Sequence, residues 1–338
     1  MSRIVTFGEI MMRLEPPGYA RLVQTDSFRV VFGGAEANVA LGLASLGDDA
    51  AFVTRLPAHA MGDAAVNSLR RYGVDTRHIA RGGNRVGIYF NEKGADLRGG
   101  VCIYDRSHSA ISEASAADFD WDEIMRGADH FHLTGITPAL GRQMPDICIE
   151  ACRAAHRAGA AVSFDLNYRS KLWSIDEARP VLSAICREAD VLIANAGQAR
   201  DILGAGADGD VCGSDDLCRD IAAGLCEKYG FSHAALTVRR SISAFDNRIW
   251  GLVYNTKSGE CAFSRRYDVH IVDRVGGGDA FAAGYIHAAL AGMTDAECAS
   301  FATAAEALKH SIEGDAALVS AAEVSSLAFG GASGEVKR

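Results

Sequence analysis

The sequence lacks an apolar run long enough to span a bilayer, and its first ten residues, MSRIVTFGEI, lack the pattern of a signal peptide. Its nine cysteines include no C-x-x-C pair, and no histidine cluster accompanies Cys148 and Cys152, which are four residues apart. These absences argue against a membrane span, a disulfide framework and a zinc site. We therefore expect a cytoplasmic protein with free, buried thiols.

Positive charge is also in short supply. The formal net charge is -9, which argues against a nucleic-acid partner because such a partner calls for a basic face. Phosphate ligands are not excluded, since backbone N–H groups can bind them. With 338 residues, 49% of them apolar, the chain has enough material for one large α/β domain with an appended piece.

From about residue 120 onward, short apolar strands alternate with helical stretches. The expected strands are 130–135, 160–167, 189–197 and 233–238. This alternation predicts a mostly parallel sheet covered by helices on both faces. Polar residues stand where these strands end, and ligands of open α/β sheets bind at that edge. These residues are expected either to line one crevice or only to cap loops. They are Thr134, Asp165, Asn167, Asn195 and Thr237.

Two β-rich segments, roughly residues 12–34 and 85–107, break this pattern. In the first, RLVQTDSFRVVFGG shows alternating apolar positions; in the second, VGIYF and VCIYD flank a turn-rich stretch typical of a hairpin. We expect the two segments to pair into a small sheet that acts as a lid over the crevice. A helix over 35–46 follows the first segment, with Gly47 suited to its C-terminal cap.

The most informative stretch is DRVGGGDAFAAG, residues 273–284, in which three glycines precede Asp279 at an apparent helix start. Glycines let a backbone approach an anion closely, and a helix N-terminus presents unpaired N–H groups. The stretch fits neither G-x-G-x-x-G nor the P-loop. An anion-binding loop with a carboxylate at its rim remains. Asp279 is then either a general base for a substrate hydroxyl or only a helix N-cap.

The stretch resembles the C-terminal signature of the ribokinase-like, or PfkB-type, carbohydrate kinases, and FGGAEANVALGLASLG (32–47) resembles their N-terminal signature. Further stretches, among them FGEIMMRLEPPG and DLNYRSKLWS, narrow the resemblance toward the 2-keto-3-deoxygluconate kinases within that family. The resemblance implies a three-layer α/β/α fold with a mostly parallel central sheet and a small β-sheet lid. It covers residues 1–330, and we expect residues 331–338 to form a flexible tail.

The resemblance also implies roles for residues. Asp279 would be the base that accepts the proton from the sugar's primary hydroxyl, and Gly276, Gly277 and Gly278 would form the anion hole for the transferring phosphoryl group. The cofactors would be ATP and Mg²⁺. The implied nucleotide contacts come from Asn195, Thr237, Arg239, Gly276 and Gly278.

A sugar acid would need an arginine fork for its carboxylate, and Arg106 and Arg169 match those positions. The remaining sugar-side positions implied by the resemblance are Gly34, Asn38, Tyr89, Tyr104, Asn167 and Asp315. The residue types alone are also compatible with purely structural roles. The tyrosines could be ordinary sheet residues, Arg106 a solvated surface charge and Asp315 a turn residue.

The chain departs from the family pattern in a few places. Arg274 replaces the signature threonine, and Gly277 replaces its alanine. Gln198 stands where the family has a glutamate tied to magnesium, which leaves the metal ligands open. Arg239 and Arg240 replace a glycine-rich turn and are candidates for phosphate contacts. A fructokinase-like kinase and a non-catalytic sugar-binding protein remain alternatives, and a homo-oligomer formed through the lid is expected.

Overall fold

The computed structural model describes residues 2–206 and 208–330, so the expected tail at 331–338 lies outside the described residues. A large sheet runs through the centre, in the order β13-β12-β11-β10-β9-β8-β1-β4-β5, with β14 beside β12. Neighbours from β11 to β5 are parallel, and β12 pairs antiparallel with β11. The strands are β1 (Arg3–Phe7), β4 (Asp49–Leu56), β5 (Ile79–Arg81), β8 (His130–Thr134), β9 (Ala161–Asp165), β10 (Val191–Asn195), β11 (His233–Ser241), β12 (Asp246–Asn255), β13 (Glu260–Phe263) and β14 (Tyr267–His270).

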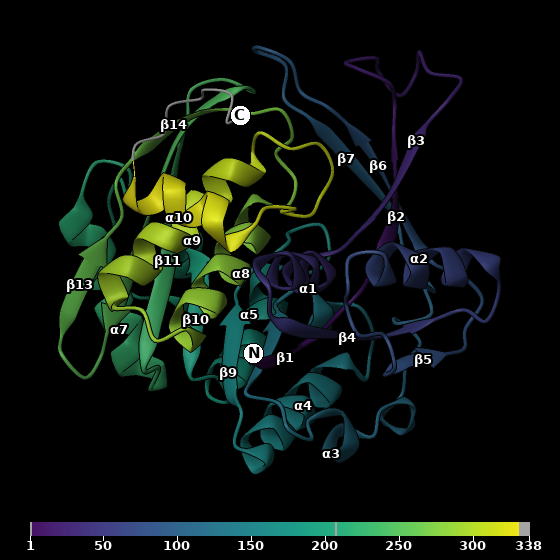
Figure 1. Cartoon of the computed structure of the whole chain (residues 1–338), viewed down its shortest axis with the longest axis horizontal. Coiled ribbons are helices and arrows are strands. Elements are labelled where there is room, and N and C mark those ends of the chain that lie inside the picture. Colours follow the sequence, from purple (N-terminus) through teal and green to yellow (C-terminus); the bar gives the residue numbers. More distant parts are fainter. Residues whose placement is uncertain (1, 207, 331–338) are drawn as a thin grey trace.

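Helices cover both faces of this sheet and form two separate apolar cores (Figure 1). One core holds α3 (Trp121–Ile124), α4 (Met144–Ala158), α5 (Ile175–Cys186), α6 (Ala196–Leu203) and α7 (Asp215–Tyr229). The other holds α1 (Ala35–Leu46), α2 (Ala60–Arg70), α8 (Gly277–Leu290), α9 (Asp295–Lys309) and α10 (Ala321–Phe329). Short 3-10 turns lie at Ala116–Asp118 and Thr137–Ala139. The predicted three-layer α/β/α fold is therefore confirmed.

A second, four-stranded sheet stands apart from the helical layers, at the upper right of Figure 1. Its order is β3-β2-β6-β7, from β2 (Met11–Glu15), β3 (Arg29–Gly33), β6 (Gly87–Glu92) and β7 (Val101–Asp105). The predicted hairpin of β6 and β7 is present, with Tyr89 opposite Tyr104. We call this four-stranded sheet the lid.

The first part of RLVQTDSFRVVFGG is not a strand, although its alternation suggested one. The chain turns between Arg21 and Gln24, whose backbone groups bond each other, and the Thr25 hydroxyl donates to the Ser27 carbonyl. These local hydrogen bonds compete with sheet pairing, so the strand is confined to Arg29–Gly33. Helix α1 agrees with expectation, and Gly47 ends it in the left-handed conformation with φ 104°.

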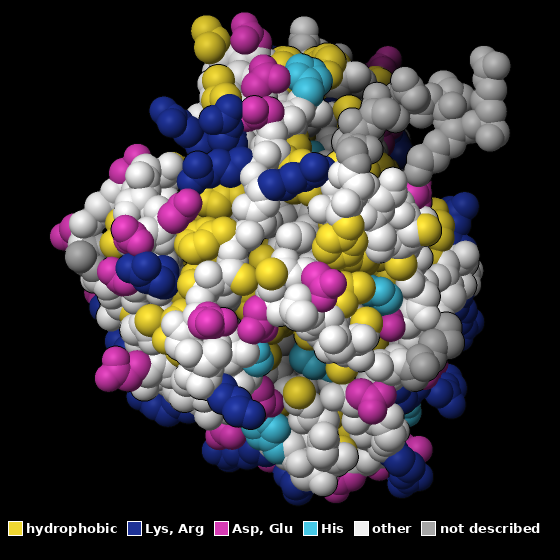
Figure 2. All heavy atoms as spheres, turned by 60° about the vertical axis from the view of Figure 1, so that its left-hand side comes forward, with side chains coloured by type: hydrophobic (Ala, Val, Ile, Leu, Met, Phe, Trp, Pro, Cys, Tyr) yellow, Lys and Arg dark blue, Asp and Glu magenta, His cyan; other side chains and the backbone are white. Residues whose placement is uncertain are grey.

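No helix in the described part of the chain is long and apolar enough to cross a membrane. Its nine cysteines are free thiols, as expected, but only six of them are buried; Cys102, Cys212 and Cys261 are partly exposed. On the face shown in Figure 2, acidic and basic side chains are interspersed, with one group of Lys and Arg near the top of the view.

Candidate active site

A cleft of about 910 Å³ lies between the lid and the carboxyl ends of β9, β10 and β11. All fifteen site residues expected from the sequence line it: Gly34, Asn38, Tyr89, Tyr104, Arg106, Asn167, Arg169, Asn195, Thr237, Arg239, Gly276, Gly277, Gly278, Asp279 and Asp315. Thr134 was expected to line this crevice and does not. It is fully buried, and its hydroxyl donates to the Glu36 carboxylate at 2.8 Å.

The three glycines start α8, each in a different environment. Gly276 is the N-cap with φ 85°, and a Cβ there would lie 1.7 Å from the Asp315 carbonyl oxygen, so only glycine fits. A Cβ on Gly277 would meet the His310 ring at 2.6 Å. Gly278 faces open space, where a side chain would stand in the cleft. The loop thus presents backbone without side chains, and the positive end of a helix, to the cleft. Both features favour the binding of an anion.

Asp279 is not the N-cap of α8, because Gly276 holds that position. Its Oδ2 instead accepts a hydrogen bond of 2.7 Å from Nδ2 of Asn38 on α1. Burial raises the pKa of Asp279 to about 7, and the Asn38 bond opposes that rise. The alternative that Asp279 only caps a helix is therefore wrong. A buried carboxylate with a pKa near neutrality suits proton transfer.

Asp165, at the end of β9, is a second buried acid of the cleft. Burial, together with the nearby Asp279 charge, raises its pKa to about 7. Its Oδ1 accepts a 3.1 Å bond from the backbone N–H of Asn167, which has the left-handed φ of 29°. The strand end thereby turns sharply and places Asn167 in the cleft.

At the end of the neighbouring strand β10, Asn195 caps α6 and donates to the Thr237 carbonyl oxygen at 3.3 Å. The Gln198 amide both accepts from the Tyr168 N–H (3.2 Å) and donates to the Tyr168 carbonyl (3.0 Å). A glutamate could not donate the second bond, which is a structural reason for glutamine here. Within residues 2–206 and 208–330 no group of three or more His, Cys, Asp or Glu could hold a metal ion.

Two arginines, Arg239 and Arg274, also line the cleft. Arg239 donates to Glu306 Oε1 at 2.7 Å and contacts His310 Nε2 at 2.9 Å, whereas Arg240 is exposed and does not line the cleft. Arg274, the large cation in the signature loop, donates to Asn247 Oδ1 at 3.1 Å. Burial and the Arg239 charge lower its pKa. Two cations close enough to repel each other favour an anion between or beside them.

The lid supplies the sugar side of the cleft. The rings of Tyr89 and Tyr104 stack with centroids 5.9 Å apart, and the Tyr89 hydroxyl donates to Asp315. Arg106 lies over the Tyr104 ring and is bound by Glu9, with Nε 2.8 Å from Oε2, so it is not a solvated surface charge. Arg169 is exposed to the cleft and makes no ion pair with any residue the structure describes.

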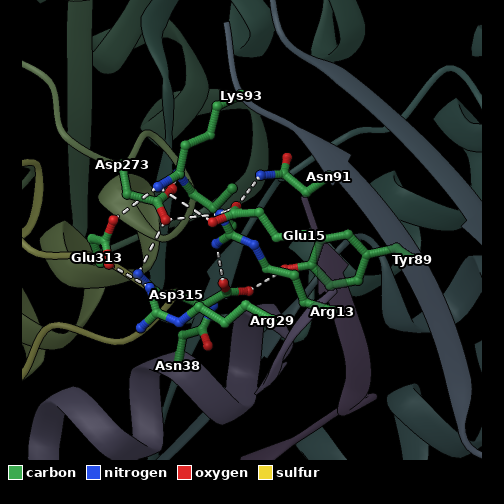
Figure 3. A network of polar contacts seen from close by, with 12 residues as sticks. Arg13, Glu15, Arg29, Asn38, Tyr89, Asn91, Lys93, Asp273, Glu313 and Asp315 are labelled. Carbon is green, nitrogen blue, oxygen red and sulfur yellow. Dashed lines mark hydrogen bonds and ion pairs between the residues drawn. The ribbon is translucent and has the colours of Figure 1, made fainter. Parts of the chain in front are cut away.

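Several residues of this region were not predicted from the sequence, and the most important of them is Arg13 on β2. Its side chain is fully buried against Glu15, Asp273 and Asp315 (Figure 3). The strand alternation could have indicated this burial. In MMRLE, Arg13 and Glu15 stand at alternate positions with Met11, so they share its face of the strand, and all three are buried.

A three-layer α/β/α fold, a glycine loop beside a buried carboxylate and a β-sheet lid define a kinase of the ribokinase-like class. The family model described as pfkB family carbohydrate kinase matches residues 1–237 and 250–320. The chain belongs to this family and is a carbohydrate kinase, that is, a phosphotransferase.

Named relatives are similar over almost the whole chain. A 2-dehydro-3-deoxygalactonokinase of Haloferax volcanii is 32% identical over 333 residues, 98% of each chain. A 2-dehydro-3-deoxygluconokinase of Bacillus subtilis is 29% identical over 313 residues, 92% of this chain and 90% of the relative. The crystal structure of 2-dehydro-3-deoxygluconokinase from Thermotoga maritima has a TM-score of 0.94 and 48% identity, covering 97% of this chain and 98% of the other.

Proposed function

We propose that this kinase transfers a phosphoryl group from ATP to the primary hydroxyl of a 2-keto-3-deoxy sugar acid, with 2-keto-3-deoxygluconate as the first candidate. One observation carries the proposal. Asp279, a buried carboxylate with a pKa of about 7, stands in the first turn of a helix whose glycine N-terminus opens into the cleft. A base and an anion site are thereby placed side by side, as phosphoryl transfer to an alcohol requires.

In this mechanism Asp279 Oδ accepts the proton of the attacking hydroxyl, and Asn38 orients the carboxylate. The N–H groups of Gly276–Gly278 stabilise the negative charge that develops on the transferring group. The nucleotide is bound in the cleft by Asn195, Thr237, Arg239 and Arg274. Mg²⁺ would neutralise phosphate charge when bound, and phosphate oxygens would be its main ligands, since the described residues include no group of three or more His, Cys, Asp or Glu that could hold a metal ion.

The sugar acid is recognised by its carboxylate. Arg169 has no carboxylate partner within the described chain, and Arg106 is held in place by Glu9. A neutral sugar would leave the Arg169 charge unpaired in the cleft. Tyr89, Tyr104, Gly34, Asn167 and Asp315 surround the rest of the substrate. The gluconate and galactonate epimers carry the same carboxylate and the same primary hydroxyl, and relatives named for each are similar to this chain.

The lid is also proposed as the contact of a homo-oligomer. On its outer face, Val30, Leu14, Phe90 and Ile103 form one cross-strand row, because each is opposite the next in register. Val30 is 52% exposed and Ile103 50%. A second copy of the lid would bury this apolar row. Sedimentation of the wild type and of Val30→Glu tests it: a wild-type monomer would refute the contact.

A coupled assay of ADP release over a panel of sugars and sugar acids tests the substrate. Turnover with 2-keto-3-deoxygluconate or its C4 epimer supports the proposal. Turnover only with fructose or ribose would replace it with a fructokinase-like activity. Binding of the keto-deoxy acids without turnover would contradict their assignment as substrates. The panel thus tests the identity of the substrate, whereas the role of Asp279 as the base is tested separately by substitution.

A further inference from the structure

The buried Arg13 side chain lies at the junction of three parts of the molecule (Figure 3). It belongs to the lid strand β2, but its Nη2 donates to Asp273 Oδ2 at 2.8 Å and its Nη1 to Asp315 Oδ1 at 2.5 Å. It also bonds Glu15 on its own strand. Burial alone would lower the pKa of Arg13, but Asp315 and Asp273 hold it above the ordinary value.

Asp273 connects Arg13 to the glycine loop. Its Oδ1 accepts from the N–H of Val275 at 3.1 Å, and its Oδ2 accepts from the N–H of Gly314 at 3.0 Å. Val275 directly precedes Gly276. The carboxylate therefore fixes the chain at the point where it enters the anion loop.

Asp315 flanks the loop on its other side. Its carbonyl oxygen occupies the place that a Cβ of Gly276 would take, and its carboxylate accepts from the Tyr89 hydroxyl on the lid. One guanidinium thus holds both carboxylates that bracket Gly276. Lys93 and Arg29, also on or next to lid strands, bind Glu313 two residues before Asp315.

We propose that Arg13 is a positioning residue that couples the docked lid to the geometry of the phosphoryl-binding loop. It does not line the cleft and need not touch substrate. Its two-pronged fork sets the separation of Asp273 and Asp315, and through them the direction of the Gly276–Gly278 N–H groups. The inference rests on the proposed role of that loop, and it makes phosphoryl transfer depend on a lid residue behind the sugar site.

Arg13→Met tests this directly. We expect kcat to fall at least about 100-fold, the effect of a displacement near 1 Å at a reacting centre, with a smaller change in the dissociation constant for ATP. The matched control is Arg29→Met, which removes a lid arginine bound to Glu313 at the exposed end of the same junction. A surface ion pair contributes little, so the control keeps kcat within about threefold.

Arg13→Lys separates geometry from charge and serves if Arg13→Met does not fold. Lysine keeps the charge but cannot hold two carboxylates in a fixed fork, so kcat should still fall at least about tenfold at a temperature where the variant is folded. A double-mutant cycle with Asp273→Asn should show losses that are far from additive. Wild-type kcat in folded Arg13→Lys and Arg13→Met, or additive losses, would overturn the inference.

Any sugar that the wild type phosphorylates serves in this assay. If the sugar acids fail and another sugar turns over, the proposed substrate is wrong while the role of Arg13 is still measured.

Discussion

Nδ2 of Asn38 donates a 2.7 Å hydrogen bond to Oδ2 of Asp279, across 241 positions of the chain. The two residues belong to the two glycine-containing segments that the sequence singled out, and their helices, α1 and α8, pack against each other. The bond fixes the direction of a buried carboxylate and stabilises its ionised form. The two segments therefore act on one functional group.

Asp279→Asn removes the proposed base while keeping an oxygen for Asn38. We expect kcat to fall by about 10³-fold, within the range of general-base contributions, with the sugar dissociation constant nearly unchanged. Steady-state kinetics and calorimetric titration measure the two quantities. The control is Asp216→Asn, an exposed carboxylate in the first turn of α7. Near-native turnover in Asp279→Asn would remove the base assignment.

Asn38→Ala should move the pH dependence of kcat. In the wild type a base with a pKa of about 7 loses activity as pH falls through 7. The Asn38 bond lowers that pKa, so its loss raises the pKa and shifts the acidic limb of the profile to higher pH. The variant should recover part of its lost kcat at pH 9. An unshifted limb would show that Asn38 does not tune the carboxylate.

Stability should respond to Asp279→Asn in the opposite sense from activity. The pKa of Asp279 is about 7 in the folded protein, mainly through burial, against about 3.9 in an unfolded chain. Its ionised form therefore costs stability as pH rises from 4 to 7, by up to about 4 kcal/mol. The variant should melt higher than the wild type at pH 8 and show little gain at pH 4.5. An equal shift at both values would contradict this cause.

Arg169→Met addresses the substrate carboxylate. We expect KM for the keto-deoxy acid to rise about 10- to 100-fold, as for a lost charged hydrogen bond of 1.5–3 kcal/mol, whereas KM for ATP stays near the wild-type value. Arg187→Met is the control, since Arg187 does not line the cleft. An unchanged sugar-acid KM would assign the carboxylate to another group, with Arg106 the first to test.

The adjacent Arg239 and Arg240 form a natural pair for the nucleotide side. Arg239 lines the cleft and Arg240 points to solvent. Arg239→Lys keeps the charge near buried Glu306 but loses the fork, and KM for ATP should rise about tenfold, or 1.4 kcal/mol. Arg240→Ala should leave it unchanged. Equal effects of the two substitutions would contradict a specific contact of Arg239.

The sequence by itself determined the architecture and most of the site. Strand–helix alternation gave the parallel sheet, the polar strand ends marked the cleft edge, and DRVGGGDAFAAG marked the anion loop. These features are readable because they depend on local periodicity and on backbone conformations that only glycine adopts easily.

Tertiary structure alone decided which polar and charged groups meet. Arg13 with Asp273 and Asp315, Arg106 with Glu9, and Gln198 with the Tyr168 backbone are pairings between separate elements. No local pattern encodes them, because a side chain's partner depends on how layers pack and which groups burial leaves without water. The same packing placed Asn38 on Asp279, and so decided that this aspartate is a buried acid and not a helix cap.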